Sequence, residues 1–406
     1  MGRIVHVTFL LIAILLVSGV FRYGLAWWDV GHRELAARAI DFLPDGWREF
    51  FKHYEEFIRE TSVWPDTVLA MQAGESYNHY YDSEFPLEEH IRDPSKGRLP
   101  WRVAELMGNL TQYIKDENWY KVLETAGILS HYLADSSQPY HSTVDYNPPI
   151  TSNVSAPGVR PKHAVLEGTH AQYLNEVIPP DLDIKPTYIE DPFSFMFDFL
   201  NESRSFLPEV NRILLGSDIT DPSDDRDWPD IKPILENRSI RAIWLISSMW
   251  YTAIVDADAL DKAPDPSQFA TLSIKVSGLE PPQKPSIIYI TVKVVDAINV
   301  PIRPDNIVMK MGGESIKLTE SDLGTYTAKL SSDMVRSFSG KTVEISITAS
   351  KAGYEPASYQ DTITFPSYEP AGEAPEGGPS IDITYIGVAI AIVAVIIVVL
   401  LLKRFR

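Results

Sequence analysis

The chain has 406 residues, 22% of them charged and 45% hydrophobic, which is ordinary for globular protein and leaves ample material for a core. Its formal net charge is −19, and the absence of cysteine excludes disulfides and thiolate metal ligands. Without the basic residues of 1–26 and 403–406, 31 basic residues remain against 55 acidic ones. Because duplexes are bound by neutralising phosphates with Lys and Arg, we expect no duplex nucleic acid as partner.

Residues 1–26 have the features of a secretory signal peptide. Arg3 provides a basic start, Phe9 to Val20 an apolar core, and Gly24-Leu25-Ala26 a small-x-small cleavage sequence. An uncleaved N-terminal anchor is the alternative. Cleavage after Ala26 would make Trp27 the first residue of the mature chain.

Residues 27–265 are predicted to form an all-α domain. Apolar side chains recur with a period near 3.6 in Arg33–Leu43, which is typical of an amphipathic helix. The Pro- and Asp-rich stretch Asp221–Pro233 is expected to be a surface loop. Further helices are predicted over Trp47–Arg59, Arg102–Lys115, Trp119–Ala134, Ala164–Glu176, Pro192–Leu215 and Ile240–Ala259.

After Asp265 the sequence changes to short, β-branched and partly alternating segments, with Gly, Pro, Asn and Asp between them. This spacing predicts a β-sandwich over residues 266–366, with an immunoglobulin-like fold as the candidate. The predicted strands are Thr271–Val276, Ile287–Asp296, Ile307–Met311, Thr325–Leu330, Thr342–Thr348 and Asp361–Phe365.

The C-terminal part predicts membrane attachment. Residues 367–382 are rich in Pro, Gly and Glu and are expected to form a flexible stalk. Residues 383–402 form an uncharged apolar segment long enough for a transmembrane helix, and the basic tail 403–406 predicts a cytoplasmic C-terminus. The expected protein is therefore multidomain, single-pass in the cell membrane, with its bulk extracellular.

One short stretch concentrates potential metal ligands. His131 and Asp135 are four residues apart in a predicted helix, so their side chains leave the same face. Pro139 is expected to end that helix, with His141 in the turn beyond it. Imidazole and carboxylate groups presented together by a rigid element are suitable zinc ligands.

The helical domain holds further candidate ligands before and after this stretch. A histidine follows five residues after Trp27, an aspartate follows Pro65, and a second i,i+4 pair combines histidine with glutamate. These candidates are His32, Asp66, His79, His163 and Glu167.

This ordered set resembles the zinc-dependent phospholipases C and the related single-strand-specific nucleases of fungi and plants. The shared pattern is an N-terminal Trp with a nearby His, then Asp, His, His-x3-Asp-x5-His and His-x3-Asp/Glu. The resemblance covers Trp27 to about Ala263 and none of the β-rich part. It implies an all-helical phosphodiesterase with three zinc ions.

The resemblance also implies how the ions are held. The implied ligands are Trp27 (through its α-amino nitrogen and carbonyl oxygen) and His32 for one ion, Asp66, His79 and His131 for a second, Asp135 bridging these two, and His141, His163 and Glu167 for a third.

Such a centre suits phosphodiester hydrolysis. Two close zinc ions can share a hydroxide at neutral pH and stabilise the charge that grows on a phosphoryl group. Asp66 is the expected catalytic residue, which would orient the nucleophile or take its proton. Since Trp27 would contribute its free amine, a cleavage site moved by one residue would destroy that ligand.

The ligand pattern leaves the substrate open between phospholipid and single-stranded nucleic acid. Glu167 and the lack of cysteine resemble the phospholipases, whereas the pair His79-Tyr80 resembles the nucleases, which stack a base on a neighbouring aromatic ring. Thr67 stands where bacterial phospholipases carry an aromatic that helps to hold choline. We favour a membrane-anchored phospholipase C-like hydrolase, with a nuclease as the alternative. A third possibility is a non-catalytic surface or adhesion protein with structural zinc.

Overall fold

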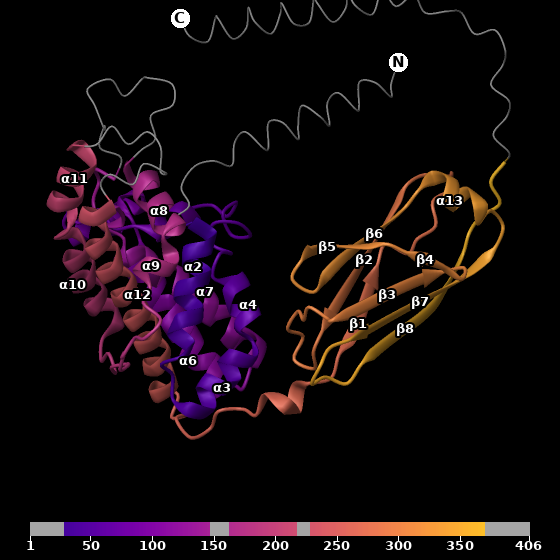
Figure 1. The fold of residues 1–406 in the computed structure, drawn as a ribbon, viewed down its shortest axis with the longest axis horizontal. Coiled ribbons are helices and arrows are strands. Elements are labelled where there is room, and N and C mark those ends of the chain that lie inside the picture. The colour runs from indigo at the N-terminus through magenta and orange to yellow at the C-terminus, as the bar shows by residue number, and fades with distance from the viewer. Residues whose placement is uncertain (1–27, 147–161, 217–227, 370–406) are drawn as a thin grey trace, which may run out of the picture.

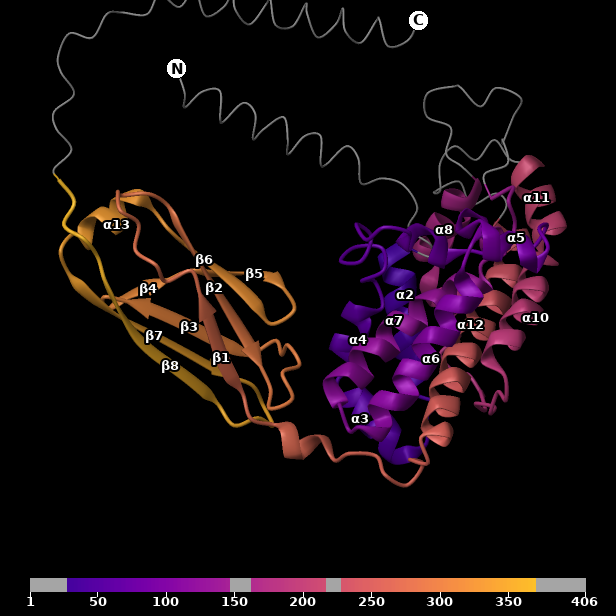
Figure 2. The same cartoon turned by 180° about the vertical axis from the view of Figure 1, so that it is seen from behind.

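The computed structural model describes residues 28–146, 162–216 and 228–369. An all-helical domain is followed by a domain of β-strands, and the two lie side by side (Figure 1). The opposite view shows the same separation (Figure 2). The predicted succession of a helical domain and a separate β-domain is therefore confirmed.

Several predicted segments lie outside the described residues. They are the signal peptide 1–26, Trp27, all but the first three residues of the stalk 367–382, the apolar segment 383–402 and the tail 403–406. Among the described residues, no helix is both long enough and apolar enough to cross a lipid bilayer.

Helix α7 is the central element of the helical domain. Every residue from Thr125 to Ser137 is buried, as expected for a helix surrounded by others. The Asn118 side chain accepts a hydrogen bond from the backbone N–H of Lys121 at its start, and the helix ends before Pro139 as predicted. The central helix and its neighbours are α7 (Trp119–Ser137), α2 (Trp28–Ile40), α4 (Glu55–Thr61), α6 (Leu99–Lys115) and α12 (Trp228–Asp256).

Some predicted helix boundaries are wrong. The predicted helix Trp47–Arg59 is interrupted at Tyr54. The predicted helix 164–176 is interrupted at Tyr173, and the predicted helix 192–215 is interrupted between Arg204 and Leu207. Residues 228–233, predicted as loop, open α12. Pro229 lies in the first helical turn, where N–H groups lack helical partners, whereas Pro233 lies inside the helix. The remaining helices are α3 (Asp45–His53), α5 (Leu87–Arg92), α8 (Lys162–Gln172), α9 (Leu174–Val177), α10 (Pro192–Arg204) and α11 (Leu207–Gly216), with 3₁₀ helices η1 (Glu75–His79), η2 (Pro94–Lys96) and η3 (Pro139–Ser142).

The β-domain consists of two four-stranded antiparallel sheets, ordered β1-β2-β6-β5 and β4-β3-β7-β8. Ile290 and Val292 of one sheet and Met311 and Ile345 of the other are fully buried and belong to a common core. The strand order is that of an immunoglobulin sandwich with β4 as an extra edge strand. The strands are β1 (Ser273–Ser277), β2 (Ile288–Val295), β3 (Asn306–Met311), β4 (Glu314–Ile316), β5 (Leu318–Asp322), β6 (Thr325–Leu330), β7 (Thr342–Ser350) and β8 (Ala357–Thr364), and η5 (Pro266–Phe269) precedes β1 while α13 (Ser332–Ser337) precedes β7.

Polar contacts connect the two domains. The Tyr54 hydroxyl donates a hydrogen bond of 2.6 Å to Asp296, and the backbone N–H groups of Ile298 and Val300 donate to the same carboxylate. His53 and Tyr354 form a second hydrogen bond across the boundary, also 2.6 Å long. The buried Asp296 carboxylate is therefore hydrogen-bonded at both oxygens, one of them to the residue that lies between α3 and α4.

Candidate metal centre

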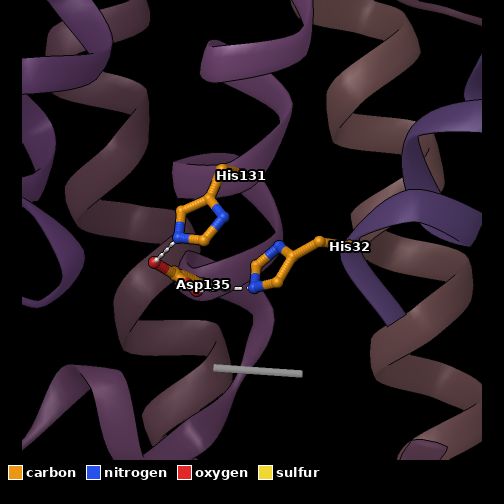
Figure 3. Close-up of side chains that lie close together, drawn as sticks. All are labelled: His32, His131 and Asp135. Atoms are coloured by element: carbon orange, nitrogen blue, oxygen red, sulfur yellow. Dashed lines mark ion pairs between the residues drawn. The ribbon is translucent and has the colours of Figure 1, made fainter. Parts of the chain in front are cut away.

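Helix α7 brings His131 and Asp135 to the interior of the helical domain, one turn apart on the same face. Neither side chain is exposed to solvent. His32, from α2, stacks its ring on His131 with centroids 3.9 Å apart, and its Nε2 lies 3.5 Å from Asp135 Oδ1. Figure 3 shows these three side chains converging between the helices.

A second group meets the other oxygen of Asp135. His79 ends η1, and Asp66 lies in the segment between α4 and η1. His79 Nδ1 lies 3.0 Å from Asp135 Oδ2 and 3.1 Å from His131 Nε2. His131 Nε2 is 3.4 Å from Asp135 Oδ2, and Asp66 Oδ1 is 3.7 Å from both imidazole nitrogens.

These separations match a tetrahedral ion site. Zinc bonds to nitrogen and oxygen of about 2.0–2.1 Å place neighbouring tetrahedral ligands about 3.3–3.4 Å apart. The five separations above scatter from 3.0 to 3.7 Å around that value. The four side chains therefore surround a centre of the right size for zinc.

A third group lies on the other side of the same region. His141 in η3 and His163 in α8 approach to 2.8 Å through their Nε2 atoms. Glu167 Oε1 lies 2.7 Å from His163 Nε2 and 3.6 Å from His141 Nε2. Glu167 is one turn after His163, so the predicted i,i+4 pair points to one centre.

Buried side-chain atoms without hydrogen-bond partners indicate whether a cation would fit between these residues. Both ring nitrogens of His32 and the Oδ1 atom of Asp135 are buried without a hydrogen-bond partner. Such orphaned groups cost about 1–3 kcal/mol each, and more when charged. A divalent cation between His32 Nε2 and Asp135 Oδ1, which lie 3.5 Å apart, would satisfy these two atoms, so the residues fit the ion that the resemblance implies.

Backbone carbonyls orient two of the imidazoles. His131 Nδ1 donates to the Ser62 carbonyl at 2.8 Å, and His141 Nδ1 donates to the His79 carbonyl at 2.5 Å. Since a carbonyl only accepts, these bonds put the ring proton on Nδ1 and leave Nε2 with a free lone pair facing the cluster.

The charges of the cluster perturb one another strongly. Burial raises the pKa of Asp66 to about 8, with the carboxylates of Asp135 and Glu167 adding to the effect. Burial works against protonated His79, but hydrogen bonds to Asp135 and Glu75 raise its pKa to about 10. Burial also opposes the ionised form of Asp135, yet His131 and the other surrounding histidines hold its pKa below the usual range.

The structure thus assembles the predicted ligands that it describes. Trp27 lies outside the described residues, and the other eight fall into three groups whose candidate ligand atoms lie within 4.8 Å of one another. The groups are His32 with His131 and Asp135, Asp66 with His79 and His131, and His141 with His163 and Glu167. Asp135 faces His32 through Oδ1 and His79 through Oδ2, so it would be able to serve two ions, one through each oxygen.

Sequence reasoning missed the residues that support the ligands. Glu75 lies 3.6 Å from His79 Nε2, and Gln138 donates to Glu167 Oε1 at 3.1 Å. The i,i+4 spacing of Glu75 and His79 was a usable signal. The role of the Ser62 carbonyl could not be predicted from the sequence, because every residue type carries a backbone carbonyl.

A buried arginine anchors the end of α7. Arg238 of α12 is fully buried and donates to the Ser137 carbonyl at 3.0 Å and to Ser203 Oγ at 2.9 Å. Ser203 Oγ in turn donates to the Ser136 carbonyl at 2.6 Å. These bonds satisfy carbonyls that the helix end leaves without partners, two residues beyond Asp135.

A buried cluster of imidazoles and carboxylates inside a helical domain defines a candidate metal-binding centre. Residues 27–148 match the family model for S1/P1 nuclease. Over these residues the chain is similar to the S1/P1 nucleases, one arm of the family that the ligand pattern resembles. The match includes His141 but ends before His163 and Glu167, so these two members of the third group are supported by geometry alone.

Two solved structures illustrate more distant likenesses. No curated protein matches the chain. The alpha toxin of Clostridium absonum is 14% identical with a TM-score of 0.42, covering 87% of this chain and 96% of the toxin. The alpha-toxin of an avian strain of Clostridium perfringens is 15% identical with a TM-score of 0.36, covering 84% and 99%. Likenesses this weak carry no inference about activity.

Proposed function

We propose that this chain is a zinc-dependent, phospholipase C-like phosphodiesterase that acts outside the cell, anchored through residues 383–402. The observation that carries the enzymatic part of this proposal is a near-tetrahedral group of four side chains, namely Asp66, His79, His131 and Asp135. His32 lies next to the other oxygen of Asp135. Bound zinc would acidify water and stabilise charge on a phosphoryl group. The anchor is proposed from the sequence alone.

Within this centre the protein side chains have separate tasks. Asp135 holds two groups together, and His131 is fixed by its bond to the Ser62 carbonyl. Asp66 is the proposed proton acceptor. Its side chain is nearly buried, and its Oδ1 atom lies 3.7 Å from both His79 Nδ1 and His131 Nε2, inside the cluster.

Exposed apolar side chains near the ligands favour a lipid substrate. Val30, Val68 and Val144 are each about half exposed and lie two or three residues from His32, Asp66 and His141 respectively. Met71 is 78% exposed, and the half-exposed Tyr146 ring lies 6.4 Å from the ring of His163. A phospholipid presents a phosphate beside apolar chains, so it complements a polar centre with apolar surroundings.

The charge balance disfavours nucleic acid. Single-stranded DNA is held by a positively charged groove. Two arginines near the centre are already paired: Arg33 binds Glu60 at 2.8 Å, and Arg204 binds Glu84 at 2.7 Å. With 55 acidic against 36 basic residues, the whole chain repels a polyanion.

A nuclease remains the second candidate because of specific observations. The matching family model is that of the S1/P1 nucleases, and Tyr146 beside His163 offers an exposed ring on which a base could stack. Tyr80, which follows His79 in the sequence, is partly buried, and its hydroxyl donates a hydrogen bond to the Ser95 carbonyl at 2.9 Å.

A parallel substrate assay separates the candidates. Zinc-loaded protein would be given phosphatidylcholine, phosphatidylserine and single-stranded DNA under the same conditions. We expect release of diacylglycerol; release of nucleotides alone would replace the phospholipase by the nuclease. If the protein binds zinc but turns over none of these substrates, the non-catalytic surface protein is the remaining candidate.

Membrane fractionation of the chain with and without residues 383–402 tests the proposed anchor. Equal solubility of both chains would refute it.

A further inference from the structure

Glu75 faces the side of His79 that points away from the ligand cluster. His79 directs Nδ1 at Asp135 and Asp66, while its Nε2 lies 3.6 Å from Glu75 Oε1. The two residues are the first and last of η1, so a single turn holds both. The imidazole is therefore placed between the ligand cluster and a carboxylate.

Neighbouring groups fix the Glu75 carboxylate. The Tyr132 hydroxyl donates a short hydrogen bond to Oε1, and Asn78 Nδ2 donates to Oε2 at 3.1 Å. The Arg102 guanidinium lies 5.5 Å from the centre of the Tyr132 ring. The Glu75 carboxylate therefore accepts hydrogen bonds at both of its oxygens while Oε1 faces His79 Nε2.

Tyr132 connects this arrangement to the ligand helix. It is fully buried and directly follows His131 in α7. Its ring lies 5.3 Å from that of His79 in an edge-on contact. The same helix therefore supplies ligands to the cluster and, one residue further on, the donor that holds Glu75.

We infer that Glu75, held by Tyr132, is a positioning residue that orients His79 and strengthens it as a ligand. This inference rests on the proposed zinc centre but not on the substrate. A carboxylate on the far nitrogen fixes the ring proton there, leaves Nδ1 free for the ion and makes that nitrogen more basic. Removing such a partner lowers metal affinity about 10–100-fold.

The deciding variant is Glu75→Gln in the full chain. The amide oxygen still accepts from Tyr132, so the packing of η1 on α7 is retained while the negative charge beside His79 is lost. Glu124→Gln is the matched control, because Glu124 pairs with Lys121 near the other end of α7 and touches no predicted ligand. Zinc-free protein is titrated with zinc against a competing chelator of known affinity.

We expect one ion to bind about 10–100-fold more weakly in Glu75→Gln, with the other ions and the Glu124→Gln control like the wild type. Unchanged affinity of every ion would overturn the inference, since a purely structural carboxylate is replaced by the amide without loss. If the wild type binds no zinc, the proposed function fails instead, which is a different outcome.

A second variant decides the case in which Glu75→Gln does not fold. Far-UV circular dichroism and the ion held by His141, His163 and Glu167 report folding. If both are lost, Tyr132→Phe is used, which keeps the ring and removes only the hydroxyl donor. Weaker binding of one ion by folded Tyr132→Phe supports the positioning role, and wild-type affinity of all ions refutes it.

Discussion

The close contact between α7 and α4 gives a sharp prediction about the ligand helix. Gly127 lies one turn before His131, and a Cβ added there would overlap Thr61 Oγ1 and lie 2.8 Å from the Ile58 carbonyl oxygen. Rotating the Thr61 side chain cannot relieve the second contact, because Ile58 O belongs to the backbone. In Gly127→Ala, α4 must therefore move away from α7.

A matched substitution isolates the cost of this movement. In Gly108→Ala the new Cβ meets nothing within 4 Å, although Gly108 also lies inside a helix, α6. Both substitutions gain the same helix propensity, up to about 1 kcal/mol. The difference between them is the overpacking term, about 1–3 kcal/mol. We expect Gly108→Ala to stabilise the chain and Gly127→Ala to be less stable than it by that amount.

Urea unfolding of the three proteins measures the difference in the free energy of unfolding. Movement of α4 also displaces the Ser62 carbonyl, which directly follows α4 and accepts a hydrogen bond from His131 Nδ1. Zinc affinity should therefore fall in Gly127→Ala and stay unchanged in Gly108→Ala. Equal free energies of unfolding for the two variants would show that the helices are not in close contact here, and the reasoning would be refuted.

Three further predictions concern the cluster and its support. Arg238→Met should lower the free energy of unfolding by about 1–3 kcal/mol, because it leaves the buried Ser137 carbonyl without its partner, whereas Arg241→Met, which removes a partly exposed ion pair, should cost about 1 kcal/mol or less; equal losses in urea unfolding would contradict this. Asp135→Asn should reduce the number of zinc ions retained on gel filtration and lower hydrolysis by more than about 100-fold, and full retention of all ions would refute the bridge. Asp66 and His79 have folded-state pKa values of about 8 and 10, above their unfolded values, so the folded metal-free chain binds more protons than the unfolded one between pH 7 and 9. Its stability should therefore fall as pH rises through this range, while zinc, which replaces those protons, should cancel the fall; a flat profile without metal would contradict the assignment.

Local spacing made much of the site predictable. His131 and Asp135, and His163 and Glu167, are i,i+4 pairs, and both pairs lie on helices with their side chains converging. The helical period and the β-branched alternation likewise predict elements that bury one face. Each of these signals depends only on residues that are close in sequence.

Tertiary contacts were not predictable in this way. The interruption at Tyr54 is stabilised by Asp296, more than two hundred residues later in the chain. The strands β4 and β5 are short and mostly exposed, so they lack the alternation that identifies a buried strand. From the sequence alone, Gly127 is only a residue with low helix propensity. The structure shows that Thr61 packs against it and leaves no room for a Cβ atom.

The positions of the ligands explain why a polar cluster can occupy the interior of a helical domain. The three groups join α2 to α7, α7 to the segment between α4 and η1, and η3 to α8. Without cations, these groups bury carboxylates and imidazoles, which opposes folding. With cations, each group becomes a cross-link between elements that are far apart in sequence, and the free energy of metal binding adds to the stability of the fold. The same ions that would activate water therefore also hold together the helices that position Asp66 and His79.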